Sequence, residues 1–166
     1  MKYFSGFCLQ DEQALFESFT YKGDFCVVGF SYGAQKALEY VFTCKERVDK
    51  LQLISPAFFQ DKSEKFKKLQ TLSFKKKPEL YCENFLKNVT SQDLSQYFKM
   101  GTAQELQELL CYSWDKQKLQ SIMQNGTEIE VYLGENDKII NSLHVKNFFQ
   151  EFATIYYIKD GGHILC

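Results

Sequence analysis

Short apolar runs that are rich in aromatic and β-branched residues recur along the chain and predict buried strands. Turn-forming residues bound most of these runs, as in the Lys-Gly-Asp, Ser-Pro and Asn-Gly stretches. The predicted strands span residues 1–4, 25–28, 51–54, 128–133 and 154–158.

Segments with apolar residues at helical spacing separate several of these strands. Residues 11–19 have this spacing, with Asp11 as a plausible N-cap, and residues 34–44 form a second such segment. The third is 142–152, with Ser142 as its cap or first residue. Alternating strands and helices favour an α/β fold in which crossover helices join parallel strands. We therefore expect about five mostly parallel strands with flanking helices.

The alternation breaks between residues 58 and 125, where the pattern predicts several helices and no strand. Weak apolar stripes lie near residues 85–89 and 94–98, and a clear one joins Leu106, Leu109, Leu110 and Trp114. For any single aromatic residue of this region, ordinary packing is the more common role. We expect one domain overall, with a core made of residues 1–57 and 126–166 and a helical lid at 58–125.

Composition narrows the function classes. The chain has 166 residues, 45% of them hydrophobic, with 16 Phe and 10 Tyr, which suffices for one domain with a substantial core. The net charge of −1 gives no overall field that would favour nucleic acid or membrane binding. Arg47 is the sole arginine, so there is little capacity for bidentate phosphate or base recognition.

Cysteine usage argues against a metal centre. The six cysteines include no Cys-x-x-Cys pair, and only His144 and His163 are available to join them. No metal and no cofactor are predicted. The N-terminus shows neither a signal peptide nor a long apolar span, so we expect a cytoplasmic protein with reduced thiols.

The most informative motif is Gly29-Phe30-Ser31-Tyr32-Gly33, a G-x-S-x-G pattern between a predicted strand and a predicted helix. This context is typical of a nucleophile elbow, in which a strained turn lifts the serine Oγ clear of the sheet. The glycines at 29 and 33 avoid collisions across so tight a turn. The bare pattern arises by chance in about one chain in twenty of this length, and the alternative is a glycine-bounded turn with an idle serine.

A base and an acid follow in the order of a catalytic triad. Functional groups of parallel α/β sheets gather beyond the carboxyl ends of the strands, where Ser31, Asp137 and His163 are all expected. Ser31 would be the nucleophile, His163 the general base and acid, and Asp137 the group that orients the imidazole. Glu135 and Asp160 compete with Asp137, but one is too near the strand end and the other too near the histidine's own loop. His144, on a predicted helix, is expected to be structural.

An acyl-transfer site also needs two N–H donors for the oxyanion. The backbone N–H of Tyr32, directly after the nucleophile, is the expected first donor. The second should come from the loop after the first strand. Phe7 is the predicted residue, with Gly6 leaving room for the substrate.

Gly6, the pentapeptide around Ser31, Gly134-Glu135-Asn136-Asp137 and Gly162-His163 together resemble the α/β-hydrolase superfamily. The resemblance covers both ends of the chain but not residues 58–125, and it implies a minimal α/β-hydrolase fold. Only about 25 residues separate the first turn from Ser31, so a strand and helix usual in that superfamily are expected to be missing. The early strands and the last helix are expected to be absent too.

Several segments are more narrowly similar to the small pimeloyl-[acyl-carrier protein] methyl ester esterases of biotin synthesis. These are residues 2–7, 28–34, 53–58 and 160–163. This similarity implies a serine carboxylic ester hydrolase that removes the methyl ester from the far end of a carrier-bound C7 acyl chain. The alternatives are a general short-chain carboxylesterase or thioesterase, and a non-catalytic scaffold that binds a protein partner through a basic lid.

A basic segment of the lid agrees with an acidic carrier protein as partner. Between residues 61 and 79, seven lysines stand against three acidic residues, a local net charge of +4. Acyl carrier proteins are acidic, so such a patch would steer them toward the enzyme. The alternative is a solvated helix face. The candidate docking residues are Lys62, Lys65, Lys67, Lys68, Lys75, Lys76 and Lys77.

Overall fold

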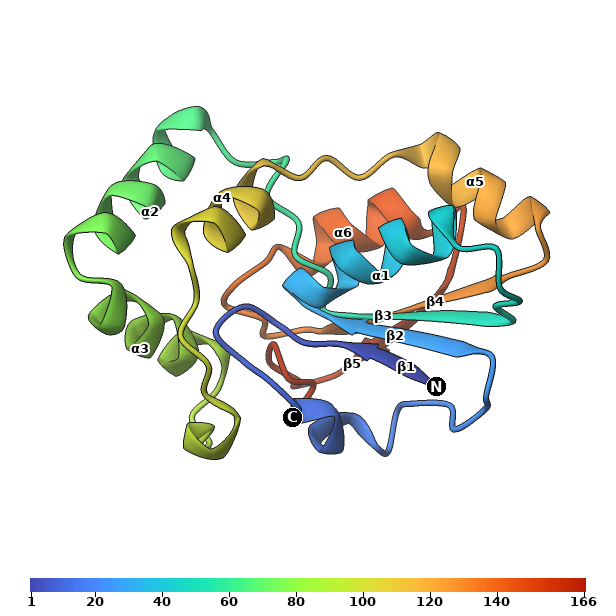
Figure 1. The fold of residues 1–166 in the computed structure, drawn as a ribbon, viewed down its shortest axis with the longest axis horizontal. Helices are drawn as coiled ribbons and strands as arrows, with labels where there is room; N and C mark the ends of the chain where they lie inside the picture. Colours follow the sequence, from blue (N-terminus) through green and yellow to red (C-terminus); the bar gives the residue numbers. More distant parts are fainter.

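The computed structural model describes all 166 residues and contains one sheet of five parallel strands in the order β1-β2-β3-β4-β5 (Figure 1). This confirms the predicted α/β class and all of the predicted strands. The strands are β1 (Lys2–Phe4), β2 (Cys26–Phe30), β3 (Lys50–Ile54), β4 (Glu128–Gly134) and β5 (Thr154–Ile158). The helices are η1 (Glu12–Phe16), α1 (Tyr32–Thr43), α2 (Glu64–Lys76), α3 (Pro78–Val89), η2 (Ser95–Tyr97), α4 (Ala103–Cys111), α5 (Lys116–Gln124) and α6 (Ser142–Phe149).

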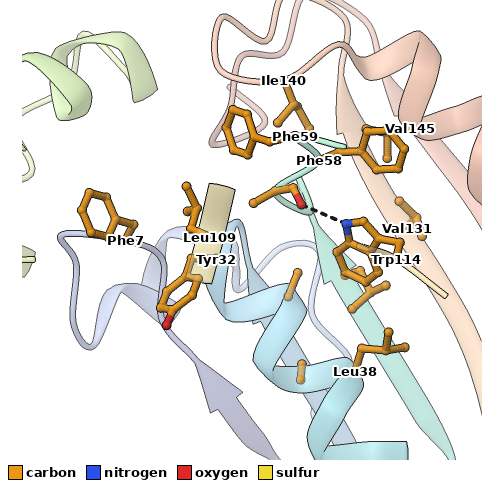
Figure 2. Close-up of a cluster of buried hydrophobic side chains, with 14 of the residues drawn as sticks. Phe7, Tyr32, Leu38, Phe58, Phe59, Leu109, Trp114, Val131, Ile140 and Val145 are labelled. Atoms are coloured by element: carbon orange, nitrogen blue, oxygen red, sulfur yellow. Dashed lines mark hydrogen bonds between the residues drawn. The ribbon is translucent and has the colours of Figure 1, made fainter. Parts of the chain in front are cut away.

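One face of the sheet is covered by α1, α5 and α6 (Figure 1). The strands follow one another across the sheet without reversal, so right-handed crossovers place α1 and α6 on the same side. Alternate strand residues such as Val27, Leu53 and Val131 point into this layer and form part of a cluster of 27 buried residues. In Figure 2, the indole N–H of Trp114 donates to the carbonyl of Ala57 at 2.9 Å, so this buried polar group is satisfied.

The opposite face is covered by the segment between β1 and β2, which includes η1 (Figure 1). Its cluster has 11 buried residues, among them Phe16, whose ring lies 4.7 Å from that of Phe30. The predicted helix over 11–19 is wrong in type and length, because only the short 3-10 helix η1 forms. Asp11 adopts a left-handed conformation with φ of 57° and its side chain makes no capping hydrogen bond.

The helices α2, α3 and α4 lie beyond the carboxyl ends of the strands (Figure 1). The apolar stripe predicted to reach Trp114 ends earlier, because α4 stops at Cys111 and the backbone of Tyr112 is extended. Trp114 is nevertheless buried, in the connection to α5. Near residues 94–98 only the single turn η2 forms, beside an isolated bridge between Leu9 and Phe98.

The last helix, α6, is shorter than the sequence predicts. The helix predicted to begin at Ser142 does so, with Asn141 as its cap, and ends at Phe149 rather than 152. None of the helices combines the length and the apolar character that crossing a bilayer requires.

Candidate active site

Ser31 occupies a strained turn between β2 and α1. Its backbone has φ of 53° and ψ of −113°, a conformation that side-chain-bearing residues rarely adopt. A Cβ on Gly29 would lie 2.4 Å from the Gly33 carbonyl oxygen, and one on Gly33 would lie 2.0 Å from the Phe4 oxygen. Both glycines are therefore required by close backbone approach. The Ser31 N–H donates to the Ile54 carbonyl at 2.9 Å, which ties the turn to the end of β3.

The structure brings Ser31, His163 and Asp137 into one hydrogen-bonded chain. His163 Nε2 lies 2.9 Å from Ser31 Oγ, and His163 Nδ1 lies 2.7 Å from Asp137 Oδ2. The side chains of His163 and Asp137 have no exposed surface. The two competing carboxylates point elsewhere, since Glu135 accepts the backbone N–H of Asp160 at 3.2 Å and neither contacts the imidazole.

Backbone donors fix the orienting carboxylate. Asp137 Oδ1 accepts the N–H groups of Ile139 at 2.7 Å and Ile140 at 3.1 Å, which leaves Oδ2 for the imidazole. These contacts hold the carboxylate in one orientation, and through it they fix the imidazole tautomer that accepts a proton at Nε2. The arrangement is thus suited to a histidine base acting on Ser31.

Ser55 was not singled out from the sequence, yet it holds the histidine loop. Its Oγ donates to the His163 carbonyl at 2.7 Å, and its own N–H donates to the Tyr132 carbonyl at 2.9 Å. The loop also passes close to β4, because a Cβ on Gly134 would lie 2.1 Å from the Gly162 oxygen. The sequence signal for Ser55 is its position directly after the buried strand β3, because the carboxyl ends of the strands carry the triad.

The two predicted oxyanion donors lie at one small cavity. Phe7 and Tyr32 both line a space of about 90 Å³ beside the loop that follows β1. Tyr32 is the first residue of α1, so its N–H has no partner inside the helix. The N–H of Phe7 makes no hydrogen bond, whereas that of Gly6 donates to Glu12 at 2.8 Å. Neither Ser31 nor His163 lines this space, so the function of the predicted pair stays a prediction.

The phenol of Tyr32 is anchored away from the serine. It donates to Glu108 of α4 at 2.6 Å, and Lys36 lies 2.5 Å from the same carboxylate oxygen. The hydrogen bonds from Lys36 and Tyr32 lower the pKa of Glu108 to about 2, while burial and the bond to Glu108 raise the pKa of Tyr32 to about 12. This network joins the start of α1 to α4.

The candidate docking lysines fall into distinct environments. Lys67 pairs with Glu64 at 3.2 Å, and Lys62 approaches Asp61 at 4.0 Å. Lys76 and Lys77 line a cavity of about 560 Å³ together with Lys138, which was not among the predicted residues. The other three form no ion pair and are exposed: Lys65, Lys68 and Lys75.

The walls of the cavity of about 560 Å³ combine apolar and polar side chains, mostly from residues 59–110. None of the triad residues lines it, but Phe85 in its wall packs on Phe7 with ring centroids 5.4 Å apart. The cavity therefore ends one aromatic side chain away from the loop that carries the predicted oxyanion donor. Its apolar lining includes Phe59, Phe66, Tyr81, Phe85, Leu109, Leu110 and Ile139.

His144, expected to be structural, is half exposed on α6 and not packed in the core. Its Nδ1 lies 2.8 Å from Asp61, so it ties α6 to the segment before α2. His144 and His163 have no hydrogen-bond partner in common. The two histidines of the chain therefore have separate roles.

The fold is the α/β-hydrolase fold that the sequence resemblance implied. No family model and no curated protein sequence matches the chain. Several solved structures are similar to it. BioG from Haemophilus influenzae is 13% identical over 98% of this chain and 87% of its own, with a TM-score of 0.61. Carboxylesterase CesB from Bacillus subtilis is 17% identical over 92% of this chain and 57% of its own, with a TM-score of 0.59.

A thermophilic esterase from Thermogutta terrifontis is 14% identical over 93% of this chain and 63% of its own, with a TM-score of 0.64. The chain spans little more than half the length of the carboxylesterases it matches, between 53% and 58% for three of them. These comparisons establish a fold shared with esterases. BioG shows that a chain of nearly this size can adopt it.

Proposed function

We propose that this protein is a serine carboxylic ester hydrolase. The observation that carries the proposal is the hydrogen-bonded chain from Ser31 through His163 to Asp137, set on a strained turn at the start of α1. A serine hydroxyl in contact with an oriented imidazole is the arrangement required for nucleophilic attack on an acyl group. The fold shared with known esterases agrees with this chemistry.

The reaction follows from the geometry. His163 Nε2 takes the proton of Ser31 Oγ as the oxygen attacks the ester carbonyl, and Asp137 stabilises the imidazolium. The N–H groups of Tyr32 and Phe7 stabilise the oxyanion of the tetrahedral intermediate. His163 then protonates the departing alcohol. A water molecule, deprotonated by the same imidazole, releases the carboxylic acid from Ser31.

We further propose that the substrate is a carrier-bound pimeloyl methyl ester, with biotin synthesis as its setting. The segment similarity to the pimeloyl-[acyl-carrier protein] methyl ester esterases supports this, as does the cavity of about 560 Å³ beside α2 and α3. An acyl chain is apolar and flexible, and eight of the fifteen residues that line this cavity are hydrophobic. Hydrolysis would release methanol and a free terminal carboxylate.

The outward face of α2 is the proposed docking surface for the acidic carrier. At 3.6 residues per turn, four lysines and two leucines fall on one side of this helix. Both leucines are more than half exposed, at 52% for Leu69 and 55% for Leu72. Apolar contact surrounded by positive charge fits an acidic helical partner better than a merely solvated face does. The surface comprises Lys65, Lys68, Leu69, Leu72, Lys75 and Lys76.

The direct test is hydrolysis of the methyl ester of pimeloyl-carrier by purified protein, followed by mass spectrometry of the carrier. We expect a mass loss of one methylene group and the release of methanol. Ser31→Ala should abolish this activity, because the nucleophile is removed. No hydrolysis by the wild type, or equal hydrolysis by the variant, would contradict the proposal.

A charge-reversal experiment tests the docking surface separately. Replacing Lys65, Lys68 and Lys75 by Glu should lower kcat/KM on the carrier-bound ester by about 10- to 100-fold, mainly through slower association. Small free esters should be hydrolysed as before. The matched control reverses three exposed lysines elsewhere, Lys22, Lys45 and Lys159. Equal losses in both variants would favour a general esterase or thioesterase that does not recognise the carrier.

A further inference from the structure

The oxyanion loop, Ser5–Phe7, is attached to the weakest part of the sheet. It follows β1, a strand of three residues at the sheet edge that pairs only with β2. The loop makes one hydrogen bond to the rest of the molecule, from the Gly6 N–H to Glu12 Oε1 at 2.8 Å. Its other hydrogen bond is local, from the Leu9 N–H to the Gly6 carbonyl. Glu12 is therefore the loop's hydrogen-bonded anchor, in addition to the packing of the buried Phe7 ring on Phe74 and Phe85.

Glu12 is a charged residue type in a fully buried position. Its side chain is fully buried beneath the sheet, and Oε1 also accepts the hydroxyl of Tyr3 at 3.0 Å. Burial and the nearby carboxylate raise the pKa of Tyr3, so the hydroxyl keeps the proton that it donates. The second oxygen, Oε2, is buried without any partner. Burying a carboxyl in this way costs stability, and such exceptions to good packing tend to occur at functional sites.

The contact with Glu12 decides which N–H of the loop remains available. Because Gly6 donates to the carboxylate, its own N–H is not available to an oxyanion, whereas the N–H of Phe7, beside the cavity shared with Tyr32, makes no hydrogen bond. The helix η1 also contributes to the packing around His163. Phe16 of η1 packs on Phe30, whose ring lies 5.1 Å from that of His163. η1 thus contacts the supports of both halves of the site.

We propose that Glu12 is a positioning residue for the oxyanion hole, holding Gly6 so that the Phe7 N–H faces the developing oxyanion. Glu12 touches no reacting atom and acts through the loop backbone. The inference rests on the proposed ester hydrolysis, since an oxyanion forms only if Ser31 attacks an acyl group. It assigns a role to the segment that stands in place of the missing strand and helix.

The test compares Glu12→Met with Glu12→Gln. Methionine fills a similar volume but offers Gly6 no strong acceptor, so the loop loses its anchor. We expect kcat on a short-chain nitrophenyl ester to fall by about 100-fold with KM nearly unchanged, as for loss of one oxyanion donor. The glutamine oxygen can accept both hydrogen bonds, so Glu12→Gln should retain kcat within about 3-fold. Unchanged kcat in Glu12→Met would overturn the proposal.

A control separates positioning from stability. Glu130 is a second buried carboxylate on the same sheet face, bonded to Gln52 and Tyr132, but its contacts lie outside the oxyanion loop. Glu130→Met should lower Tm without changing kcat of the folded protein. If Glu12→Met does not fold, Glu12→Asp withdraws the acceptor by one methylene and should also lower kcat. Normal kcat in Glu12→Asp would then overturn the proposal.

Failure of the proposed function gives a different result. If wild-type protein hydrolyses no ester and Ser31 does not react with a fluorophosphonate, the esterase proposal fails and the role of Glu12 falls with it. If the wild type is active and Glu12→Met loses only Tm, the esterase proposal stands and the role proposed for Glu12 is wrong. Activity and labelling of the wild type therefore test the esterase proposal, whereas kcat of Glu12→Met tests the role of Glu12.

Discussion

The triad and the oxyanion loop are supported in different ways. Ser31 and Asp137 follow the inner strands β2 and β4, and His163 follows the edge strand β5; each is tied by hydrogen bonds that involve the backbone or Ser55. The oxyanion loop follows the three-residue edge strand β1, and its one hydrogen bond to the rest of the molecule goes to Glu12. The two regions also pack into different clusters, since Phe7 belongs to the cluster of 27 buried residues and Phe30, which packs on His163, belongs to the cluster of 11. The oxyanion loop thus has fewer hydrogen-bonded supports than the triad.

The largest expected effect is on the triad. Asp137→Asn keeps the volume but replaces a carboxylate oxygen by an amide, which favours the wrong imidazole tautomer. We expect kcat to fall by about 10⁴-fold with little change in Tm. Asp160→Asn is the matched control and should be fully active, because Asp160 contacts the site only through its backbone N–H to Glu135. Equal kcat values for the two variants would show that Asp137 does not orient the base.

A second variant affects the junction of the two regions. Gly33 lies against the end of β1, so the Cβ of Gly33→Ala would press on the Phe4 carbonyl and separate the elbow from the oxyanion loop. We expect a loss of at least about 3 kcal/mol in unfolding free energy, measured by urea titration, and a large fall in kcat. Gly162→Ala is the control, since its nearest non-neighbouring atom would lie at 3.4 Å. Full stability of Gly33→Ala would contradict the close approach.

Ser55→Ala tests the support of the base. The variant leaves the buried His163 carbonyl without its hydroxyl donor, and we expect a loss of about 1–3 kcal/mol in stability. The kcat should also fall, by about 10-fold, as the imidazole loses its fixed position. Ser142→Ala removes a comparable buried bond, from its Oγ to the Gly134 carbonyl at 2.6 Å. It should lose similar stability but keep a higher kcat. If both variants have equal kcat, Ser55 only stabilises the fold.

The smallest effect is expected from the link between α1 and the lid. The pKa of Glu108 is lowered to about 2 from an ordinary 4.5, so its ion pair stabilises the folded state above pH 4.5 and is lost as pH falls toward 2. Glu108→Gln should therefore cost up to about 1 kcal/mol at pH 7, since the pair is near the surface. The difference in Tm between wild type and variant should shrink below pH 4.5. A difference that grows in acid would reverse the assignment.

The sequence was sufficient for the sheet and for the residues that the structure joins around Ser31. Buried strands of a parallel sheet are short apolar runs, and their carboxyl ends share one edge, so the positions of Asp137 and His163 followed from chain order. Helix boundaries were less predictable. The stripe through Trp114 has helical spacing, yet α4 ends at Cys111 because Trp114 packs on Phe149 of another helix.

The parts that could not be predicted depend on contacts between distant residues. Ser55 resembles a strand-ending serine until the fold places it beside the carbonyl of His163, 108 positions later. The apolar spacing of residues 11–19 predicts a longer helix than η1. The local sequence does not reveal that the Glu12 side chain is buried and accepts hydrogen bonds from Tyr3 and Gly6. Lys138 joined the cavity lysines only through the position of the loop after β4.

The central claim is that Ser31 is a nucleophile activated by His163. The most direct measurement is the reaction of the purified protein with a fluorophosphonate, followed by mass spectrometry of the labelled peptide. One adduct per chain on Ser31, lost in Ser31→Ala and strongly slowed in His163→Ala, is the predicted result. An unlabelled wild type, or an adduct that persists in Ser31→Ala, would contradict the claim.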